Sequence, residues 1–241
     1  DGGGMDLKVA LITGAGSGIG RAAALGLQSA GFTVVLAGRR ATELNRTAEM
    51  GLAGGSPMAA MPVDVSDPHS VQSLFNSIRE RFGRLDLLFN NAGSSAPGIP
   101  MEELSYEQWS AVLGANLTGA FLCAQQAIKM MKAQAPRGGR IINNGSLSAH
   151  VPRPNSAPYS ATKHAVVGLS TALRAEAASQ GVQVSVLCPG FVDTPLLDDV
   201  YAAPASFKGG SVRARVRLMQ PRFLTPELTA KRAVDGLAAN K

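Results

Sequence analysis

A glycine-rich turn near the N-terminus most constrains how this chain of 241 residues can fold. The apolar run before it, Lys8-Val9-Ala10-Leu11-Ile12-Thr13, is predicted to be a buried strand. The Ala/Leu-rich residues 21–30 after it are predicted to be a helix that ends before Gly31. Between them the sequence reads T-G-x-x-x-G-x-G, a spacing that lets backbone N–H groups approach a pyrophosphate at a helix N-terminus. A plain turn is the alternative, but the strand before and the helix after favour a dinucleotide site.

The rest of the chain repeats this alternation of short apolar runs and longer helical patterns. Further strands are predicted at 33–37, 58–63, 86–89, 140–144 and 182–187, and further helices at 71–82, 101–131, 159–180 and 226–239. Connections of this length suit parallel strands joined by helices. The sequence therefore predicts an α/β fold, a doubly wound parallel sheet of six to seven strands with helices on both faces.

A single domain is expected to span residues 5–241, since no repeat or linker divides the chain. The first four residues, before Met5, are interpreted as a cloning remnant. Residues 196–222 follow no clear period and carry Gly209-Gly210 with several basic side chains, so we expect a mobile lid over the substrate site. The basic side chains suit a substrate with an anionic tail, such as an acyl-carrier or coenzyme A thioester, or else only face solvent.

Composition argues against several classes of function. The formal net charge is +6, but the basic residues are scattered and not interleaved with aromatic ones, so no nucleic-acid binding is expected. His69, His150 and His164 lie in no metal-ligand spacing, and no metal is expected. Cys123 and Cys188 form no C-x-x-C pair and are expected to be reduced and buried in a cytoplasmic protein. The sequence contains no signal peptide and no apolar run of about 18 residues, so no membrane association is expected.

The end of the second predicted strand bears on the choice of cofactor. An enzyme that binds NAD carries an acidic residue there to hold the ribose hydroxyls, but residues 31–42 contain no Asp or Glu. Arg39 and Arg40 stand there instead. Without a carboxylate nothing repels a 2′-phosphate, and a guanidinium can bind that phosphate with two hydrogen bonds. The sequence therefore favours NADP over NAD, unless the two arginines only face solvent.

Tyr159 and Lys163 are the residues that could carry acid–base chemistry. They are four residues apart at the start of a predicted helix, so their side chains would lie on one face, one turn apart. The ammonium would stabilise a phenolate and make the tyrosine a usable general acid or base. Ser146 follows the strand at 140–144, so its hydroxyl could meet Tyr159 at the mouth of a pocket. An exposed helix pair with no function is the alternative.

Two further polar residues lie beside or within apolar patterns. Asp64 follows the strand at 58–63, where it could hydrogen-bond an adenine edge or cap the helix that begins near Pro68. Asn116 interrupts the apolar stripe of the helix predicted at 101–131. A buried Asn is costly unless it is paired, so Asn116 either satisfies a neighbouring backbone group or holds a functional water.

Taken together, these motifs resemble the short-chain dehydrogenase/reductase family over nearly all of residues 7–239. They occur in the family's order, as Thr13-Gly14-x-x-x-Gly18-Ile19-Gly20, Asp64, Asn90-Asn91-Ala92-Gly93, Asn116, Ser146, Tyr159 with Lys163, and Pro189-Gly190. The resemblance implies a Rossmann fold and an oxidoreductase that moves a hydride between a nicotinamide cofactor and a ketone or secondary alcohol.

The resemblance also implies roles for individual residues. Tyr159 would exchange the proton of the substrate oxygen, Ser146 would hold that oxygen, and Lys163 would hydrogen-bond the nicotinamide ribose. Asn116 would position a water that links Lys163 to solvent. Together with the residues predicted above, the expected cofactor-binding set is Gly14, Ser17, Gly18, Ile19, Gly20, Arg39, Asp64, Val65, Asn90, Ala92, Gly93, Tyr159, Lys163, Pro189, Gly190, Val192 and Thr194. Ser148, His150 and Asn155 are expected near a small-molecule substrate.

The resemblance leaves the substrate open. A carbonyl reductase or alcohol dehydrogenase is the leading hypothesis, a 3-oxoacyl-thioester reductase is the alternative enzyme, and a catalytically silent cofactor sensor or scaffold is the alternative of another class.

The strand end Asn143-Asn144-Gly145 is more polar than is usual in the family, and Ser17 stands where NADP-preferring relatives often have a basic residue. The family's seventh strand is not found after the last predicted helix. A homotetramer or homodimer is implied, with residues 120–131 and 165–178 as candidate interface helices.

Overall fold

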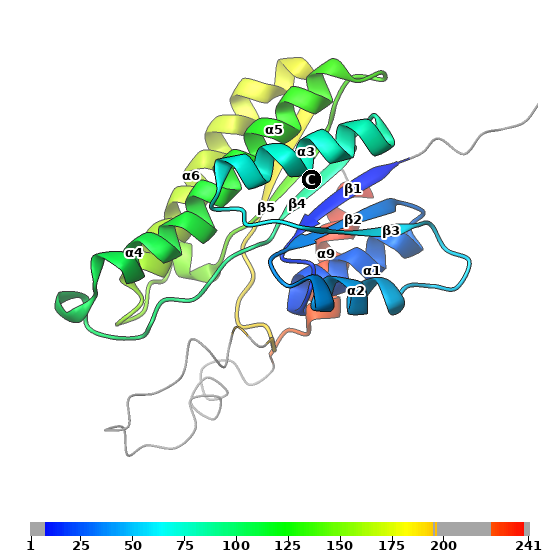
Figure 1. Cartoon of the computed structure of the whole chain (residues 1–241). Helices are drawn as coiled ribbons and strands as arrows, with labels where there is room; N and C mark the ends of the chain where they lie inside the picture. The colour runs from blue at the N-terminus through cyan, green and yellow to red at the C-terminus, as the bar shows by residue number, and fades with distance from the viewer. Residues whose placement is uncertain (1–7, 195, 197–222, 239–241) are drawn as a thin grey trace, which may run out of the picture.

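Six parallel strands form the centre of the molecule (Figure 1). The computed structural model describes residues 8–194, 196 and 223–238. The strand order is β3-β2-β1-β4-β5-β6, and every pairing is parallel. The strands are β1 (Val9–Thr13), β2 (Thr33–Gly38), β3 (Met58–Pro62), β4 (Leu87–Asn90), β5 (Gly139–Asn144) and β6 (Val182–Leu187). The expected doubly wound parallel sheet is confirmed, with six strands in the described part of the chain.

Helices cover both faces of this sheet (Figure 1). One face carries α1 (Gly18–Ser29), α2 (Ala41–Glu49) and α9 (Pro226–Ala238), of which α1 and α9 pack together. The other face carries α3 (Pro68–Phe82), α4 (Tyr106–Leu113), α5 (Gly119–Ala133) and α6 (Ala157–Ala177). Short 3₁₀ turns η3 (Leu147–Ala149) and η4 (Ala178–Gln180) flank α6. The strand–helix alternation read from the sequence therefore produces a three-layer α/β architecture.

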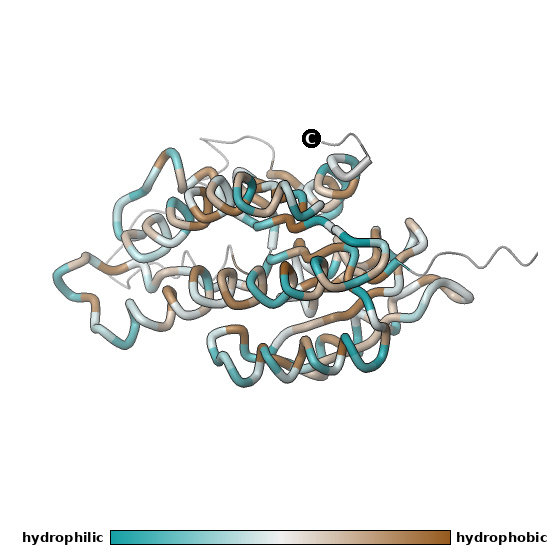
Figure 2. Tube along the Cα trace, turned by 90° about the horizontal axis from the view of Figure 1, so that it is seen from above, coloured by the Kyte–Doolittle hydropathy of each residue, from teal (hydrophilic) through white to brown (hydrophobic). Residues whose placement is uncertain are grey.

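The helix α3 illustrates why the helices lie on the sheet. Its buried residues Val71, Leu74, Phe75 and Ile78 recur at helical spacing and form one apolar face. Figure 2 shows the same mixture of hydrophobic and hydrophilic residues along the other helices. Residues 9–12 of β1 are fully buried because helices cover both sides of the strand. Two apolar cores result, one on each face of the sheet.

The long helix predicted at 101–131 is confirmed from Tyr106 onward, but its first residues and its middle differ from a regular α-helix. The structure has a 3₁₀ turn, η1 (Met101–Glu103), then α4, a π-helical turn η2 (Gly114–Thr118), and α5. Ser105 and Gln108 form a capping box that starts α4 at Tyr106. A π-helical turn inserts an extra residue into the helix, and such turns are frequent at functional sites. Asn116 lies within this turn.

The stretch Tyr106–Ala133 is the one candidate membrane span among the described residues. It is 28 residues long and contains an 18-residue window with a mean hydropathy of 1.2, which satisfies a requirement of length and composition only. Within it, α5 packs against the sheet and α3, and the core helices of globular domains satisfy the same requirement. The stretch is therefore weak support for a membrane span.

The winding of the sheet reverses beside β1. Strands β2 and β3 lie on one side of it, and β4, β5 and β6 lie on the other. In doubly wound sheets, ligands bind in the crevice at the carboxyl ends of the strands next to this reversal. The loops after β1 and β4 meet there. The predicted lid, residues 196–222, lies outside the described residues except for Leu196.

Candidate active site

A cavity of about 1030 Å³ lies at the carboxyl ends of the strands. The loops that follow all six strands contribute to its wall, together with the first turns of α6. Pockets for small ligands usually measure about 300–1,000 Å³, so this cavity can hold a ligand as large as a dinucleotide.

The turn after β1 is shaped by glycines that leave no room for a side chain. Gly14 has a φ of +67°, and a Cβ atom on it would lie 2.9 Å from the Asn91 amide nitrogen. Gly20 does not line the cavity. A Cβ atom there would collide with the Gly14 carbonyl oxygen, so Gly20 lets α1 approach the turn. Its predicted contact with the cofactor is therefore corrected to a packing role.

Side chains from α1 and α2 hold the carbonyl groups of this turn. Arg21 donates to the Gly16 carbonyl oxygen and, at 2.8 Å, to the Glu43 carboxylate. The Thr47 hydroxyl donates to the Ala15 carbonyl oxygen at 3.0 Å. With these carbonyl groups bound outside the cavity, the turn is free to direct N–H groups towards an anion.

Amide and hydroxyl side chains connect three strand ends. The Thr13 hydroxyl accepts hydrogen bonds from the main-chain N–H groups of Asn91 and Ala92, each at 2.9 Å. The Asn91 amide donates to the Thr13 carbonyl oxygen at 3.1 Å and accepts from the Asn144 amide at 2.9 Å. Lys163 donates to the Asn144 carbonyl oxygen at 2.7 Å. The polar end of β5 noted in the sequence thus links α6 to the loop after β4.

Arg39 and Asp64 line the opposite end of the cavity, after β2 and β3. The Asp64 carboxylate accepts hydrogen bonds from the Ser66 hydroxyl at 2.7 Å and from the Ser66 N–H group at 2.9 Å. These bonds, with a smaller effect from the Arg39 charge, hold the pKa of Asp64 below its ordinary value. Asp67 caps α3 by accepting from the His69 N–H group at 2.9 Å, so the alternative that Asp64 caps this helix is wrong.

Ser146, Tyr159 and Lys163 lie on the wall near β5 and α6. The Lys163 Nζ atom is 5.6 Å from the centroid of the Tyr159 ring, and Lys163 is only 5% exposed. The Ser146 hydroxyl accepts from the Ser148 N–H group at 3.1 Å, which leaves its own proton available to a ligand. A phenol, an ammonium and a hydroxyl donor on one wall can together exchange a proton with a carbonyl or alcohol oxygen.

Asn116 is buried and does not line the cavity. Its amide oxygen accepts from the Ser94 N–H group at 2.7 Å, and its amide nitrogen donates to the Ser94 carbonyl oxygen at 3.0 Å and to the Thr162 hydroxyl at 3.1 Å. The pairing with a neighbouring backbone is therefore confirmed. Both amide N–H donors are in use, so the side chain positions the loop after β4. The implied role of Asn116 in holding a water that leads to Lys163 stays a prediction.

The other predicted site residues divide into two groups. On the cavity wall lie Gly14, Ser17, Gly18, Ile19, Arg39, Asp64, Val65, Ala92, Gly93, Ser148, Pro189, Gly190, Val192 and Thr194. Asn90 is off the wall, because its buried amide donates to the Ala120 carbonyl oxygen at 2.8 Å and to the Asn143 amide oxygen at 3.1 Å. His150 and Asn155, predicted near the substrate, are exposed and off the wall. Asn155 has a φ of +57°, which Asn tolerates in the loop before α6.

Sequence reasoning missed part of the wall, including Val151, Arg153 and Phe191. Counting His as neutral, Arg153 is the only charged residue between Ser146 and Tyr159, and this isolated charge could have identified it. Its guanidinium carbon lies 5.0 Å from the centroid of the Phe191 ring. Burial lowers the pKa of Arg153 from its ordinary value, and the nearby Tyr159 partly opposes this effect.

Two observations show that the cavity fits a nicotinamide dinucleotide. The glycine turn leaves a cradle that side chains would fill: at Gly18, with a φ of +50°, a Cβ atom would lie 3.0 Å from Thr194. The Asn144 amide oxygen is buried and has no hydrogen-bond partner among the described residues, although Asn144 lies on the wall. Buried acceptors are usually satisfied, so this one suits a donor from a ligand or water.

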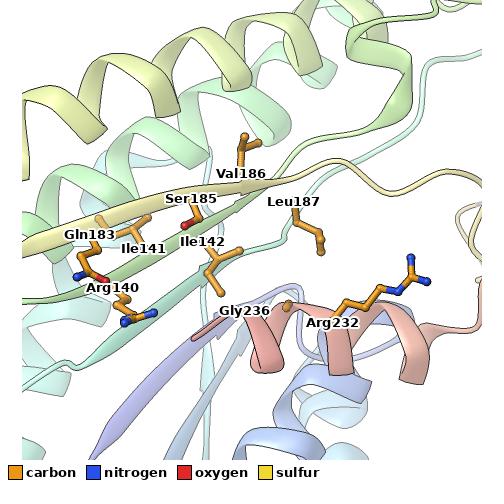
Figure 3. Close-up of a pocket in the computed structure, with 10 residues that line it drawn as sticks. Arg140, Ile141, Ile142, Gln183, Ser185, Val186, Leu187, Arg232 and Gly236 are labelled. Atoms are coloured by element: carbon orange, nitrogen blue, oxygen red, sulfur yellow. The ribbon is translucent and has the colours of Figure 1, made fainter. Parts of the chain in front are cut away.

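A smaller cavity of about 110 Å³ lies between β5, β6 and α9 (Figure 3). Ile142, Ser185 and Leu187 line it, and Figure 3 shows Arg140 and Arg232 at opposite ends of the view. Its volume is far below that of a dinucleotide site. The large cavity is therefore the candidate active site.

Comparisons with known proteins agree with this site. The chain matches the family described as short chain dehydrogenase over residues 8–205. A 3beta-hydroxysteroid dehydrogenase of Mediterraneibacter gnavus is 40% identical over 195 residues, which are 80% of this chain and 69% of that protein.

Two solved structures are also similar. One is the 3-ketoacyl-(acyl-carrier-protein) reductase of Brucella melitensis complexed with NADH, with 32% identity, a TM-score of 0.83, and coverage of 95% of this chain and 90% of that chain. The other is an actinorhodin polyketide ketoreductase variant with NADPH, with 33% identity, a TM-score of 0.88, and coverage of 95% and 89%. The chain therefore belongs to the short-chain dehydrogenase/reductase family, and it is an oxidoreductase that transfers a hydride between a nicotinamide cofactor and a ketone or secondary alcohol.

Proposed function

We propose that Ser146, Tyr159 and Lys163 carry the acid–base part of this reaction and that NADP(H) is the preferred cofactor. The observation that carries the proposal is that these three side chains and the glycine turn line the same cavity. When bound, the nicotinamide ring would supply or accept the hydride. The same arrangement argues against a catalytically silent sensor, because all the side chains that proton transfer needs are present on one cavity wall.

The three side chains have separate tasks in carbonyl reduction. Tyr159 donates its phenolic proton to the substrate oxygen and takes it back during alcohol oxidation. Lys163 stabilises the phenolate by its charge, and one N–H of its ammonium is used by the Asn144 carbonyl oxygen, so two remain for a ribose hydroxyl. Ser146 donates to the same substrate oxygen, because its own acceptor position is occupied by the Ser148 N–H group.

The preference for NADP rests on the charges beside β2. Arg39 and Arg40 line the cavity there, and no acidic residue follows the strand before Glu43. A 2′-phosphate would meet the two guanidinium groups with no carboxylate on that strand end to repel it. A 3-oxoacyl thioester is the second candidate substrate after a simple ketone, and the name of the Brucella relative favours it.

Replacement of Tyr159 tests the acid–base assignment. We expect Tyr159→Phe to lower kcat for ketone reduction by about 10²–10⁴-fold, the usual contribution of general acid catalysis. Tyr106→Phe is the matched control, since Tyr106 is 77% exposed and off the cavity wall. Activity of the Tyr159 variant within about threefold of that of the control would rule out the assignment. A panel of ketones assayed at the NAD(P)H absorbance band supplies the measurement.

A charge reversal tests the cofactor preference. A charge-assisted hydrogen bond contributes about 1.5–3 kcal/mol, so Arg39→Asp should weaken NADPH binding by tenfold or more and bring the Kd values for NADPH and NADH together. Arg46→Asp makes the same change on α2, away from the cavity wall. Fluorescence titration of both dinucleotides gives the constants. Equal losses in the two variants would remove the basis for NADP preference.

We further propose a homotetramer or homodimer that uses the outer faces of α5 and α6. Phe121 on α5 is 45% exposed, so its ring would be available to a partner at this face. Light scattering during gel filtration gives the mass in solution. Phe121→Glu should shift an oligomer to smaller species, and an unchanged elution would place the interface elsewhere.

A further inference from the structure

An acidic side chain lies close to the two arginines that are proposed to bind a 2′-phosphate. Glu43 is in the first turn of α2, and its main-chain N–H group donates to the Arg40 carbonyl oxygen at 3.1 Å. A Cβ atom built on Gly16, which lines the cavity, would lie 3.0 Å from the Cβ atom of Glu43. A free carboxylate at this place would repel a phosphate group bound to Arg39 and Arg40.

The guanidinium of Arg21 binds this carboxylate. Arg21 is on α1, which lies beside α2 on one face of the sheet (Figure 1). Its Nη2 atom donates to the Glu43 carboxylate at 2.8 Å and also to the Gly16 carbonyl oxygen. Its Nε atom donates at 3.0 Å to the hydroxyl of Thr47, a fully buried residue. Because three protein groups hold this planar group, the direction of the ion pair is fixed.

The ion pair is partly shielded from water. The side chains of Arg21 and Glu43 are 21% and 30% exposed. Water and salt screen a charge less strongly where it is partly buried, so an unpaired Glu43 would act on a nearby anion more strongly than a surface carboxylate does. As long as the opposite charges lie 2.8 Å apart, their fields largely cancel beyond the pair.

We propose that Arg21 is a positioning residue that determines cofactor specificity: by pairing with Glu43, it neutralises the first carboxylate that follows β2. A carboxylate after this strand is the feature that favours NAD over NADP. Neither Arg21 nor Glu43 lines the cavity, so the effect on a bound dinucleotide is electrostatic and needs no contact. The inference rests on the proposed preference for NADP and adds to it a residue that the cofactor does not touch.

Loss of Arg21 should have two effects that cofactor titrations can separate. The Gly16 carbonyl oxygen would lose a donor, which loosens the glycine turn and weakens both dinucleotides, because both carry the pyrophosphate. Glu43 would lose its counter-charge, which weakens only the dinucleotide that carries a 2′-phosphate. The ratio of the Kd values for NADPH and NADH therefore reports the second effect alone.

A double-mutant cycle tests the proposal. Arg21→Met removes the charge and keeps a long side chain. It should weaken NADPH binding by about 3- to 10-fold more than NADH binding, the size expected for a carboxylate that acts on a doubly charged phosphate through partly screened surroundings. Glu43→Gln removes the carboxylate and should keep or increase the preference for NADPH.

The double variant is the decisive member of the cycle. Arg21→Met combined with Glu43→Gln loses the same contact with Gly16 as the single Arg21 variant, but it should return the Kd ratio to within about twofold of the wild-type ratio. Fluorescence titration of NADPH and NADH gives the constants for each protein. If Arg21→Met does not fold, Arg21→Gln carries the same expectation, because its amide can still donate to a carbonyl oxygen.

Two further variants serve as controls. Arg21→Lys keeps a positive charge beside Glu43 but lacks the planar fork, so it should weaken both dinucleotides and leave their Kd ratio within about twofold of the wild-type ratio. Lys231→Met removes the cation of another ion pair, in which Lys231 and Asp235 are 2.6 Å apart on α9 and off the cavity wall. It should change neither constant.

Two results would overturn the inference. Equal losses of NADPH and NADH affinity in Arg21→Met would mean that Arg21 only supports the turn. A selective loss of NADPH affinity that persists in the double variant would mean that Glu43 is not its cause.

These results are distinct from failure of the proposed function. If the wild-type protein binds NADH as tightly as NADPH, the proposed preference fails, but the shift of the Kd ratio in Arg21→Met and its reversal in the double variant still test the ion pair. The titrations need no turnover, so they do not depend on the role of Tyr159.

Discussion

The glycine turn and the segment between Ser146 and Tyr159 line different parts of one cavity, and they are held in different ways. The turn is enclosed by its neighbours, since Cβ atoms at Gly14 and Gly20 would collide with groups around them. The segment after Ser146 is anchored at a few points, and Leu147 and Val151 remain largely exposed.

This difference explains what each end can tolerate. At the turn, neighbouring backbone and side-chain groups leave no room for a Cβ atom. A substitution there should therefore destabilise the turn whichever ligand is bound. In the segment after Ser146, the exposed side chains do not pack in the core, so we expect substitution there to change which ligand binds and to leave the fold intact. We therefore expect cofactor binding and substrate choice to be separable by mutation.

The largest effect on cofactor binding among the changes at the glycine turn is expected at Gly20. A Cβ atom there would collide with the Gly14 carbonyl oxygen and lie 2.6 Å from the Asn91 amide nitrogen, and neither group can move without opening the turn. Overpacking of this kind costs about 1–3 kcal/mol, so Gly20→Ala should weaken NADPH binding by about tenfold to a hundredfold and lower the Tm. Titration of NADPH fluorescence and thermal denaturation measure the two effects.

Gly26 provides the control on the same helix. A Cβ atom on Gly26 meets nothing within 4 Å, so Gly26→Ala should leave cofactor binding unchanged and stabilise α1 by about 0.5–1 kcal/mol. If Gly20→Ala bound NADPH as tightly as Gly26→Ala does, the turn would not be the rigid end of the cavity.

The next effect concerns Asn116, which joins the loop after β4 to α6 through three hydrogen bonds. Each contributes about 0.5–1.5 kcal/mol, so Asn116→Ala should lower the free energy of unfolding by about 2–3 kcal/mol. Urea denaturation measures this loss. Asn76→Ala, at a side chain that only bonds neighbours on the surface of α3, should change it by less than about 0.5 kcal/mol.

The pH dependence of kcat separates a positioning role of Asn116 from a proton path. A positioning residue lowers kcat without moving the pH profile, because the groups that titrate are unchanged. A profile displaced by a full pH unit in Asn116→Ala would instead restore the proton path implied by the family resemblance.

The fold was predictable because its signals are local. The apolar strands, the glycine turn and the spacing of residues such as Leu74 and Ile78 on α3 follow from backbone geometry and burial of apolar faces. The π-helical turn at residues 114–118 was not, because such a turn keeps the same apolar residue types as the helix around it and differs only in hydrogen bonding. Periodicity alone reads the two as one helix.

The candidate site was predictable where a residue has a single physical use. Gly14 and Gly18 have positive φ values, and the Tyr159–Lys163 spacing follows the helix period. Asn90 and Asn116 were assigned to the site through the family resemblance, but their amides bond to residues far along the chain. Arg153 was missed because its place on the wall depends on the path of the loop from Val151 to Ser156.

The smallest expected effect is a difference in reactivity between the thiols of Cys123 in the core and Cys188 near the cavity. It leaves activity unchanged. Cys123 is fully buried in α5, and burial raises the pKa of its thiol to about 12. Since this folded-state pKa lies above the ordinary thiol pKa of 9.0, the shift contributes stability below about pH 9, and that stability is lost as the pH rises towards 12.

At pH 8 the native protein should expose to a disulfide reagent at most one thiol, that of the partly exposed Cys188, and denaturant should release the second. Rapid reaction of both thiols in the native protein would mean that α5 opens readily, and the contrast between a rigid cofactor end and an adaptable substrate end would then fail.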